Sequence, residues 1–194
     1  MLRIATTDDI PEILAIYAPY IENSTATFEY DVPCLRSFTQ RFLTITQRFP
    51  WLVWEEDGRI LGYAYASAPY ERAAFSWCAE PSVYLRPEAQ GREIAAKLYA
   101  GLEAILKQQG FQVLYALITD ENTQSIRFHE KAGYVQKVHF PDCGFKFNRW
   151  LGLIWMEKRL FSVTTPKSHP THFGSICQDV QRIRDILDNL SLSK

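Results

Sequence analysis

The segment Gln90-Gly91-Arg92-Glu93-Ile94-Ala95 stands between an expected strand and a long helical pattern. Backbone N–H groups and the helix dipole form an anion site at such a junction, so phosphate binding is one interpretation. The segment lacks the Gly-Lys-Ser/Thr ending of a Walker loop and the G-x-G-x-x-G pattern of dinucleotide folds. By itself, the segment is better explained as an ordinary helix start.

Two titratable side chains could transfer protons. Glu80 follows the aromatic-rich stretch 75–78, where partial burial would raise its pKa and make it a better base near neutral pH. His129 lies in a helical pattern, and an imidazole titrates close to neutral pH. The competing interpretations are a solvent-facing strand carboxylate and a structural histidine.

Other polar and aromatic residues have both a functional and a structural interpretation. The planar fork of Arg72 suits a bidentate carboxylate, but a surface arginine has the same sequence signal. Asn122 could contact a ligand or only cap the helix that follows it. Phe28 and Phe75 could line a pocket or belong to the core.

The elements that must position these residues begin with a strand over 2–5 and a helix with Thr7 as its N-cap. Pro11 fits the first turn of this helix, whereas Pro19 is expected to end or kink it near Ala18. A second helix is expected before Pro50. Its apolar residues are Leu35, Phe38, Phe42 and Ile45.

A hairpin follows, because an Asp57-Gly58 turn joins apolar runs over 51–56 and 59–66. A β-rich stretch over 74–85 then leads into a long helix that Gly110 stops. The remaining elements are a strand over 111–118, a helix over 123–132, and strands over 134–140 and 146–156. The coarse order βααββββαβαββ predicts a mixed α/β sheet covered by helices on its faces.

Composition limits the possible partners. A chain of 194 residues with 14% aromatic residues can bury a sizeable core as one domain. Its formal charge of -1 argues against nucleic-acid binding. No signal peptide or membrane span is visible, so we expect a soluble, cytoplasmic protein. The widely spaced cysteines are expected to be free thiols: Cys34, Cys78, Cys143 and Cys177.

Several segments together resemble the phosphinothricin-type branch of the GNAT N-acetyltransferase superfamily. Residues 90–95 resemble the Q/R-x-x-G-x-G/A pyrophosphate loop, with Glu93 where the glycine belongs. Residues 120–134 closely resemble the branch's N-x-x-S-x-x-L-H-E-K-x-G-F segment. The matches in order and spacing extend from residue 2 to about 158 and include 24–29, Arg72, 79–84 and 144–150.

This resemblance implies a GNAT fold, with a mixed, mostly antiparallel central sheet, helices on both faces and a C-terminal helical tail. It implies transfer of acetyl from acetyl-CoA to the α-amino group of a small amino acid or analogue, such as phosphinothricin or methionine sulfone. Glu80 would be the general base, and His129 an acid for the thiolate or a second base. No metal is implied, and a homodimer is possible.

The resemblance also assigns binding roles. The cofactor-binding residues would be Val83, Tyr84, Leu85, Gln90, Gly91, Arg92, Glu93, Ile94, Ala95, Asn122 and Ser125. The substrate-binding residues would be Phe28, Arg72 and Phe75, with Arg72 gripping a carboxylate. A splayed pair of central strands would admit the pantetheine arm, and backbone N–H groups near 83–85 would stabilise the oxyanion.

We expect a GNAT domain over 1–160 and a linker with a helical extension over 161–194, of which 165–194 should be dispensable. The apolar stripe of this extension, docked on its own domain, comprises Val180, Ile183, Leu187 and Leu190. Two alternatives remain open. One is an acetyltransferase for another amine, such as a peptide N-terminus or a polyamine. The other is a CoA-binding regulatory module without turnover, which Glu93 motivates.

Overall fold

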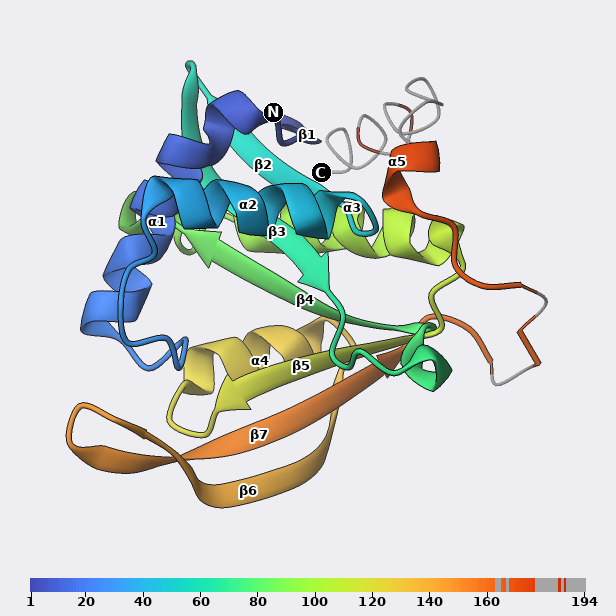
Figure 1. Ribbon diagram of the computed structural model, residues 1–194. Helices are drawn as coiled ribbons and strands as arrows, with labels where there is room; N and C mark the ends of the chain where they lie inside the picture. The colour runs from blue at the N-terminus through green and yellow to red at the C-terminus, as the bar shows by residue number, and fades with distance from the viewer. Residues whose placement is uncertain (163–164, 167, 177–184, 186, 188–194) are drawn as a thin grey trace.

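The computed structural model describes residues 1–162, 165–166, 168–176, 185 and 187 (Figure 1). Its seven strands form one sheet in the order β1-β2-β3-β4-β5-β7-β6. Only β4 and β5 pair in parallel, so the expected mixed, mostly antiparallel sheet is confirmed. The strands are β1 (Leu2–Ile4), β2 (Trp51–Glu56), β3 (Arg59–Ser67), β4 (Cys78–Leu85), β5 (Val113–Thr119), β6 (Val135–Lys146) and β7 (Arg149–Arg159).

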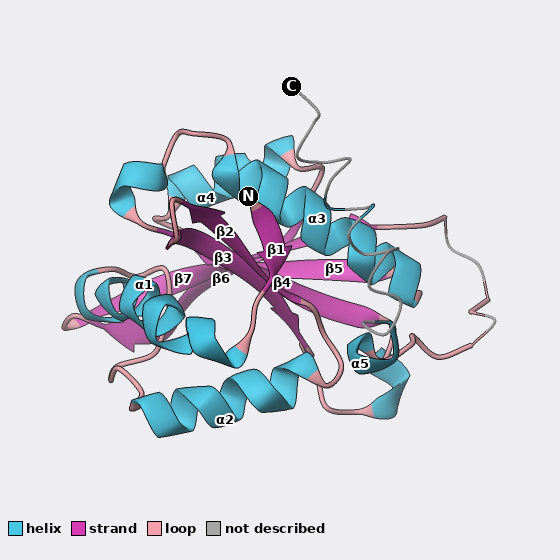
Figure 2. Ribbon diagram, turned by 90° about the horizontal axis from the view of Figure 1, so that it is seen from above, coloured by secondary structure: helices cyan, strands magenta, loops and turns pink. Residues whose placement is uncertain are grey.

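Helices cover both faces of the sheet, as expected. Figure 2 shows α1 and α2 on one face and α3 and α4 on the other. The helices are α1 (Ile10–Asn23), α2 (Leu35–Thr46), α3 (Ile94–Gln109), α4 (Thr123–Lys131) and α5 (Phe173–Ile176). The three-layer arrangement leaves the sheet between two separate apolar cores.

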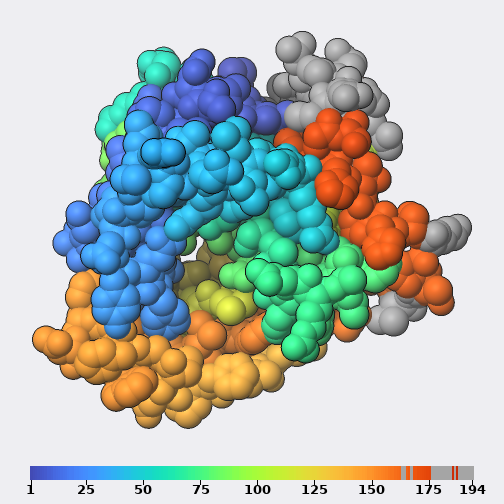
Figure 3. Space-filling model, in the orientation of Figure 1, coloured from blue at the N-terminus to red at the C-terminus, as the bar shows by residue number. Residues whose placement is uncertain are grey.

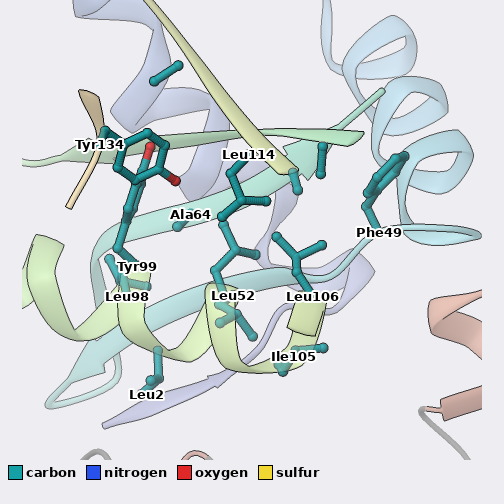
Figure 4. Close-up of a cluster of buried hydrophobic side chains, with 14 of the residues drawn as sticks. Leu2, Phe49, Leu52, Ala64, Leu98, Tyr99, Ile105, Leu106, Leu114 and Tyr134 are labelled. Atoms are coloured by element: carbon teal, nitrogen blue, oxygen red, sulfur yellow. The ribbon is translucent and has the colours of Figure 1, made fainter. Parts of the chain in front are cut away.

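The two cores follow from the alternation of side chains along the strands. On β2, Leu52 packs with the α3 core, whereas Trp51 and Val53 pack with α1 and α2. Figure 4 shows side chains of α3, including Leu98 and Leu106, gathered against this sheet face. Both faces are therefore fixed by packing, which holds β4 rigidly in the middle of the sheet.

The first helix continues through Pro19, contrary to the expectation that it ends or kinks near Ala18. A proline inside a helix costs about 3 kcal/mol because it removes one backbone hydrogen bond and crowds the preceding turn. Beyond the proline, Ile21 is buried and the Tyr20 hydroxyl donates to the Leu85 carbonyl oxygen at 2.6 Å. These tertiary contacts outweigh the local penalty.

Three strands, and not the expected four, lie between α2 and α3. The stretch 74–85 was expected to be β-rich throughout, but it begins with a short 3-10 helix, Ala73–Phe75, and β4 starts only at Cys78. The last hairpin also differs, because Lys146 ends β6 and the turn is Phe147-Asn148. The Asp57-Gly58 hairpin is confirmed, with φ of 50° and 73° at its two turn residues.

The described part of the segment 161–175, for which we expect a linker, packs in part against the domain. Phe173 is buried in the α3 core. The Thr171 N–H donates to the Gln109 carbonyl oxygen at 2.8 Å, and the Gln109 side chain donates to the Thr171 carbonyl oxygen at 2.7 Å. Of the expected apolar stripe, only Leu187 lies within the described residues, and it is buried.

Two further sequence expectations concern thiols and membranes. Cys34, Cys78 and Cys143 are free thiols, and Cys177 lies outside the described residues. In the part of the chain that the structure describes, no helix has the length and apolar character needed to cross a membrane.

Candidate active site

The centre of the sheet is open where β4 and β5 separate. The two strands pair only at Cys78–Val113 and Ala79–Leu114, and then diverge toward their C-terminal ends (Figure 1). A cavity of about 620 Å³ occupies this gap, lined by residues of β4, β5, the start of α3, and α4. The expected splay of the central strands is confirmed.

Glu80 is the first residue of β4 beyond the last parallel pair, and it lines this cavity. Its neighbour Ala79 belongs to the α3 core, so the Glu80 side chain faces the α1–α2 side of the sheet. Burial raises the pKa of the Glu80 carboxyl, and among the described residues no side chain donates a hydrogen bond to it. A carboxylate in such surroundings is a stronger base than one in water.

His129 lies on α4 and is only 5% exposed. Its Nδ1 is 2.8 Å from the Ser125 carbonyl oxygen, which can only accept, so Nδ1 carries a proton. Its Nε2 is 2.8 Å from the Tyr99 hydroxyl, which therefore donates to the neutral ring. Burial lowers the pKa of His129, so the imidazole is neutral at neutral pH.

Tyr99 connects this histidine to β4. Its hydroxyl oxygen lies 3.1 Å from the Pro81 carbonyl oxygen, next to the position of Glu80. If His129 became protonated, Nε2 would donate to the Tyr99 oxygen and the Tyr99 hydroxyl would turn to Pro81, so every donor would keep a partner. Glu80 and the Tyr99–His129 pair thus approach one cavity from opposite sides of β4.

The backbone of β4 offers one N–H group to the gap. The Arg86 N–H bonds to Leu61 of β3, so in this antiparallel pair the N–H groups of Val83 and Leu85 point the other way. Leu85 N–H is already bound by the Tyr20 hydroxyl at 3.2 Å. Val83 N–H is left facing the cavity, while the Tyr84 ring packs against Tyr20 with centroids 5.1 Å apart.

The loop before α3 forms one end of the cavity. Gln90, Gly91, Glu93 and Ala95 line it. Two neighbours do not: the Arg92 guanidinium pairs with Glu56 at 2.7 Å, and the Ile94 side chain is buried in the α3 core. The side chains of Arg92 and Ile94 are therefore directed to other partners than the cavity.

Asn122 and Ser125 line the cavity from α4. Asn122 caps this helix, because its Oδ1 accepts a hydrogen bond from the Ser125 N–H at 3.1 Å. The structural interpretation of Asn122 is thus confirmed. Its amide nitrogen makes no hydrogen bond within the described residues and faces a site where a ligand could accept one.

The predicted substrate residues lie outside this cavity. Figure 3 shows a hollow between the α1–α2 region, the loop of residues 68–77 and β7, with β5 at its floor. In the 68–77 loop, Arg72 is exposed, and the Phe75 and Tyr70 rings lie 4.3 Å apart. Phe28 comes from the opposite wall and packs on Gly144, where an added Cβ would lie 2.6 Å from its ring.

Tyr99 and Tyr20 are site residues that sequence reasoning missed. Tyr99 follows Leu98 in the apolar stripe of α3, so its pattern indicates a core residue. Tyr20 follows Pro19, where the helix was expected to have ended. Only the tertiary partners of their hydroxyl groups, His129 and Leu85, identify them.

The described residues contain no group of three or more His, Cys, Asp or Glu side chains that could hold a metal ion. The groups that line or adjoin the cavity can transfer protons, through Glu80 and the Tyr99–His129 pair, and can bind anions through backbone N–H groups.

The chain is similar in sequence to known acetyltransferases. The family model "Acetyltransferase (GNAT) domain" matches residues 2–155. The chain is 34% identical to an L-methionine sulfoximine/L-methionine sulfone acetyltransferase of Pseudomonas aeruginosa, over 82% of this chain and 94% of the relative.

Two solved structures are also similar. One is a GNAT superfamily phosphinothricin acetyltransferase from Sinorhizobium meliloti in complex with AcCoA, with a TM-score of 0.82 and 35% identity, covering 88% of this chain and 92% of that one. The other is a ribosomal-protein-alanine N-acetyltransferase from Brucella melitensis, with a TM-score of 0.80 and 33% identity, covering 82% and 99%.

Proposed function

The chain belongs to the GNAT acetyltransferase family, and we propose that it transfers the acetyl group of acetyl-CoA to the α-amino group of a small amino acid or analogue. The observation that carries this proposal is the cavity between β4 and β5, which brings Glu80 and the Tyr99–His129 pair to one gap. The relative from S. meliloti, solved with AcCoA, supports the choice of donor.

Acetyl-CoA fits the residues present. The loop 90–95 offers backbone N–H groups at the start of α3 for the pyrophosphate, and Asn122 offers its amide from α4. Beyond the last parallel pair, the facing edges of β4 and β5 are not paired with each other, so their backbone groups are open to a ligand. An extended, amide-containing arm such as pantetheine suits such an edge. When bound, acetyl-CoA supplies an activated thioester.

Glu80 prepares the amine for attack. An amine is nucleophilic only after losing the ammonium proton, and the raised pKa of Glu80 lets its carboxylate take that proton directly or through a water molecule. The nitrogen then attacks the acetyl carbon, and Val83 N–H stabilises the oxyanion that forms. Direct attack therefore needs no covalent intermediate on the protein.

The Tyr99–His129 pair supplies the proton for the leaving thiolate. The neutral His129 ring first takes up a proton from solvent at Nε2, which is hydrogen-bonded to the Tyr99 hydroxyl, and burial makes the resulting imidazolium a strong acid. As Tyr99 gives its proton to the sulfur, Nε2 returns one to the tyrosine oxygen, and the ring ends neutral. This step assigns His129 the role of acid, acting through Tyr99.

The acceptor would bind in the hollow of Figure 3, with its carboxylate on Arg72. We expect Arg72→Ala to raise the acceptor KM by about ten- to a hundredfold, the scale of one charge-assisted contact, and to leave the acetyl-CoA KM unchanged. Arg36→Ala, which removes another exposed arginine, is the control. A rise in both KM values would make Arg72 a structural residue.

A peptide N-terminus is the second candidate acceptor, because one similar structure carries the name ribosomal-protein-alanine N-acetyltransferase. Such an amine has no neighbouring carboxylate for Arg72. Thiol release should be measured with free amino acids, including methionine sulfone and phosphinothricin, with an alanine-initiated peptide and with a polyamine. The proposal predicts turnover with free amino acids. Turnover confined to the peptide or the polyamine would contradict it.

A further inference from the structure

The chain continues beyond the family match at residue 155, and part of this continuation contacts the 68–77 loop. The Trp77 indole N–H donates to the Ser168 carbonyl oxygen at 2.9 Å. The Trp77 ring also stacks on His169, with centroids 4.6 Å apart and an angle of 23° between the planes. Figure 1 shows this segment passing the start of β4, where the loop ends.

Trp77 is the residue at which the 68–77 loop joins the sheet. Its carbonyl oxygen accepts hydrogen bonds from Gln112 N–H at 2.8 Å and Val113 N–H at 3.2 Å, at the start of β5. Its neighbour Ser76 accepts from the Arg48 guanidinium at 2.8 Å. The Arg48 carbonyl oxygen in turn accepts from Phe173 N–H at 3.2 Å. The end of the loop and the segment 168–173 are therefore connected twice, directly through Trp77 and indirectly through Arg48.

The rest of the 68–77 loop contacts the sheet through Tyr70, whose ring stacks on Trp155 of β7 with centroids 6.0 Å apart. Arg72 and Phe75 are exposed, and the short 3-10 helix between them contains no buried residue. The orientation of the loop over the hollow therefore depends on the Tyr70 contact at one end and on how Ser76 and Trp77 are held at the other.

We propose that the segment 168–173 is a positioning element for the acceptor site, which it stabilises through Trp77. This inference rests on the proposed function, since Arg72 and Phe75 are taken to contact the acceptor. When the contacts of Trp77 with Ser168 and His169 are lost, a smaller fraction of molecules holds the loop in its binding orientation. The apparent affinity for the acceptor falls in proportion to this fraction.

Loss of the Trp77 contacts should leave acetyl-CoA binding unchanged. The segment makes its hydrogen bonds to α3 at Gln109, the last residue of this 16-residue helix, whereas the loop 90–95 lies at the other end of the helix. A helix of that length spans roughly 24 Å. None of the residues 168–173 lines the cavity between β4 and β5.

The test compares full-length variants in steady-state kinetics with both substrates varied, alongside thermal unfolding. We expect His169→Ala to raise the acceptor KM about three- to tenfold, the scale of one aromatic contact, with kcat and the acetyl-CoA KM within about twofold of wild type. His169→Phe, which keeps a stacking ring, should restore the acceptor KM. The control His172→Ala removes an exposed histidine of the same segment and should change nothing.

Parallel measurements on Arg72→Ala separate two kinds of failure. If Arg72→Ala raises the acceptor KM but His169→Ala does not, the positioning role is wrong and the proposed acceptor site stands. If His169→Ala raises both KM values equally, or His169→Phe fails to restore the acceptor KM, the effect is general destabilisation and the inference is overturned. If Arg72→Ala has no effect, the acceptor site and this inference both fail.

Discussion

Glu93 combines two unfavourable features at the entrance to the cofactor cavity. It stands where the family's pyrophosphate loop has glycine, and its φ of 62° lies in the left-handed region. A residue with a Cβ pays on the order of 1 kcal/mol there, and glycine does not. Glu93 also lines the cavity end where the pyrophosphate is proposed to bind, so its negative charge lies near that site.

We expect Glu93→Gly to tighten acetyl-CoA binding by about three- to thirtyfold, and the gain should shrink at high salt because exposed charges are screened. Calorimetric titration at two ionic strengths measures both effects. Glu93→Gln is the matched control, since it keeps the backbone constraint and removes only the charge. Unchanged or weaker binding by the glycine variant would mean that the loop has adapted to its carboxylate.

At the residue scale, the sequence predicts which residues line the cavity better than it predicts their hydrogen-bond partners. The residues Glu80, His129 and Asn122 all line the cavity, because their segments match a pattern that the sheet and α4 bring together. Tyr99 could not be found in this way. It lies 30 residues from His129 in the sequence. Nothing in its neighbouring residues distinguishes it from a tyrosine that serves only to fill the core.

At the scale of secondary-structure elements, the end of β6 is hydrogen-bonded to the segment that carries Phe28. Lys146 is only 2% exposed, and its ammonium group donates to the Ser24 and Thr27 carbonyl oxygens at 2.9 and 2.8 Å. Burial lowers the pKa of Lys146, and Glu29 opposes this shift. The lysine thus ties the α1–α2 connection to the last hairpin, on one wall of the hollow.

We expect Lys146→Met to lower the free energy of unfolding by about 2–4 kcal/mol, because two carbonyl oxygens lose their donor. The acceptor KM should rise as well, since Phe28 loses its support. Denaturant unfolding and steady-state kinetics measure these effects. Lys137→Met, on the exposed part of the same strand, is the control. Equal unfolding midpoints for the two variants would contradict this role.

Element boundaries were predictable where local chemistry dictates them. Asp57-Gly58 has the residues that a two-residue hairpin turn needs, and the turn is where it was expected. Phe147-Asn148 makes a comparable turn with φ of 51° and 58° but without glycine, so the sequence gives no signal for it. Irregular pairing between Phe140 and Gly144 further hides the continuity of β6.

At the scale of the whole molecule, the C-terminal extension shares the core of the family domain. Phe173 is buried in the same cluster as Phe49 and Phe111, whose rings stack 5.2 Å apart. A Cβ added at Gly101 of α3 would meet Leu187 at 3.2 Å. The apolar stripe predicts that the extension docks on its own domain, but the resemblance ends before these residues and so predicts no place for Phe173 in this core.

Removal of residues 165–194 should therefore destabilise the domain, although the sequence suggested that they are dispensable. Losing buried apolar side chains such as Phe173 costs about 4 kcal/mol, which corresponds to a fall in Tm of roughly 8–16 °C. The kcat at saturating acceptor should persist well below that Tm. Scanning calorimetry of the truncated chain and of Phe173→Ala checks this, and a wild-type Tm after truncation would refute it.

The central claim is that Glu80 removes the amine proton for direct attack on acetyl-CoA. Its most direct test is kcat of Glu80→Gln, a variant of nearly the same shape, measured at saturating acetyl-CoA and acceptor. We predict a fall of about a hundredfold or more, with acetyl-CoA affinity unchanged in a binding titration. A variant that keeps most of its turnover would contradict the account.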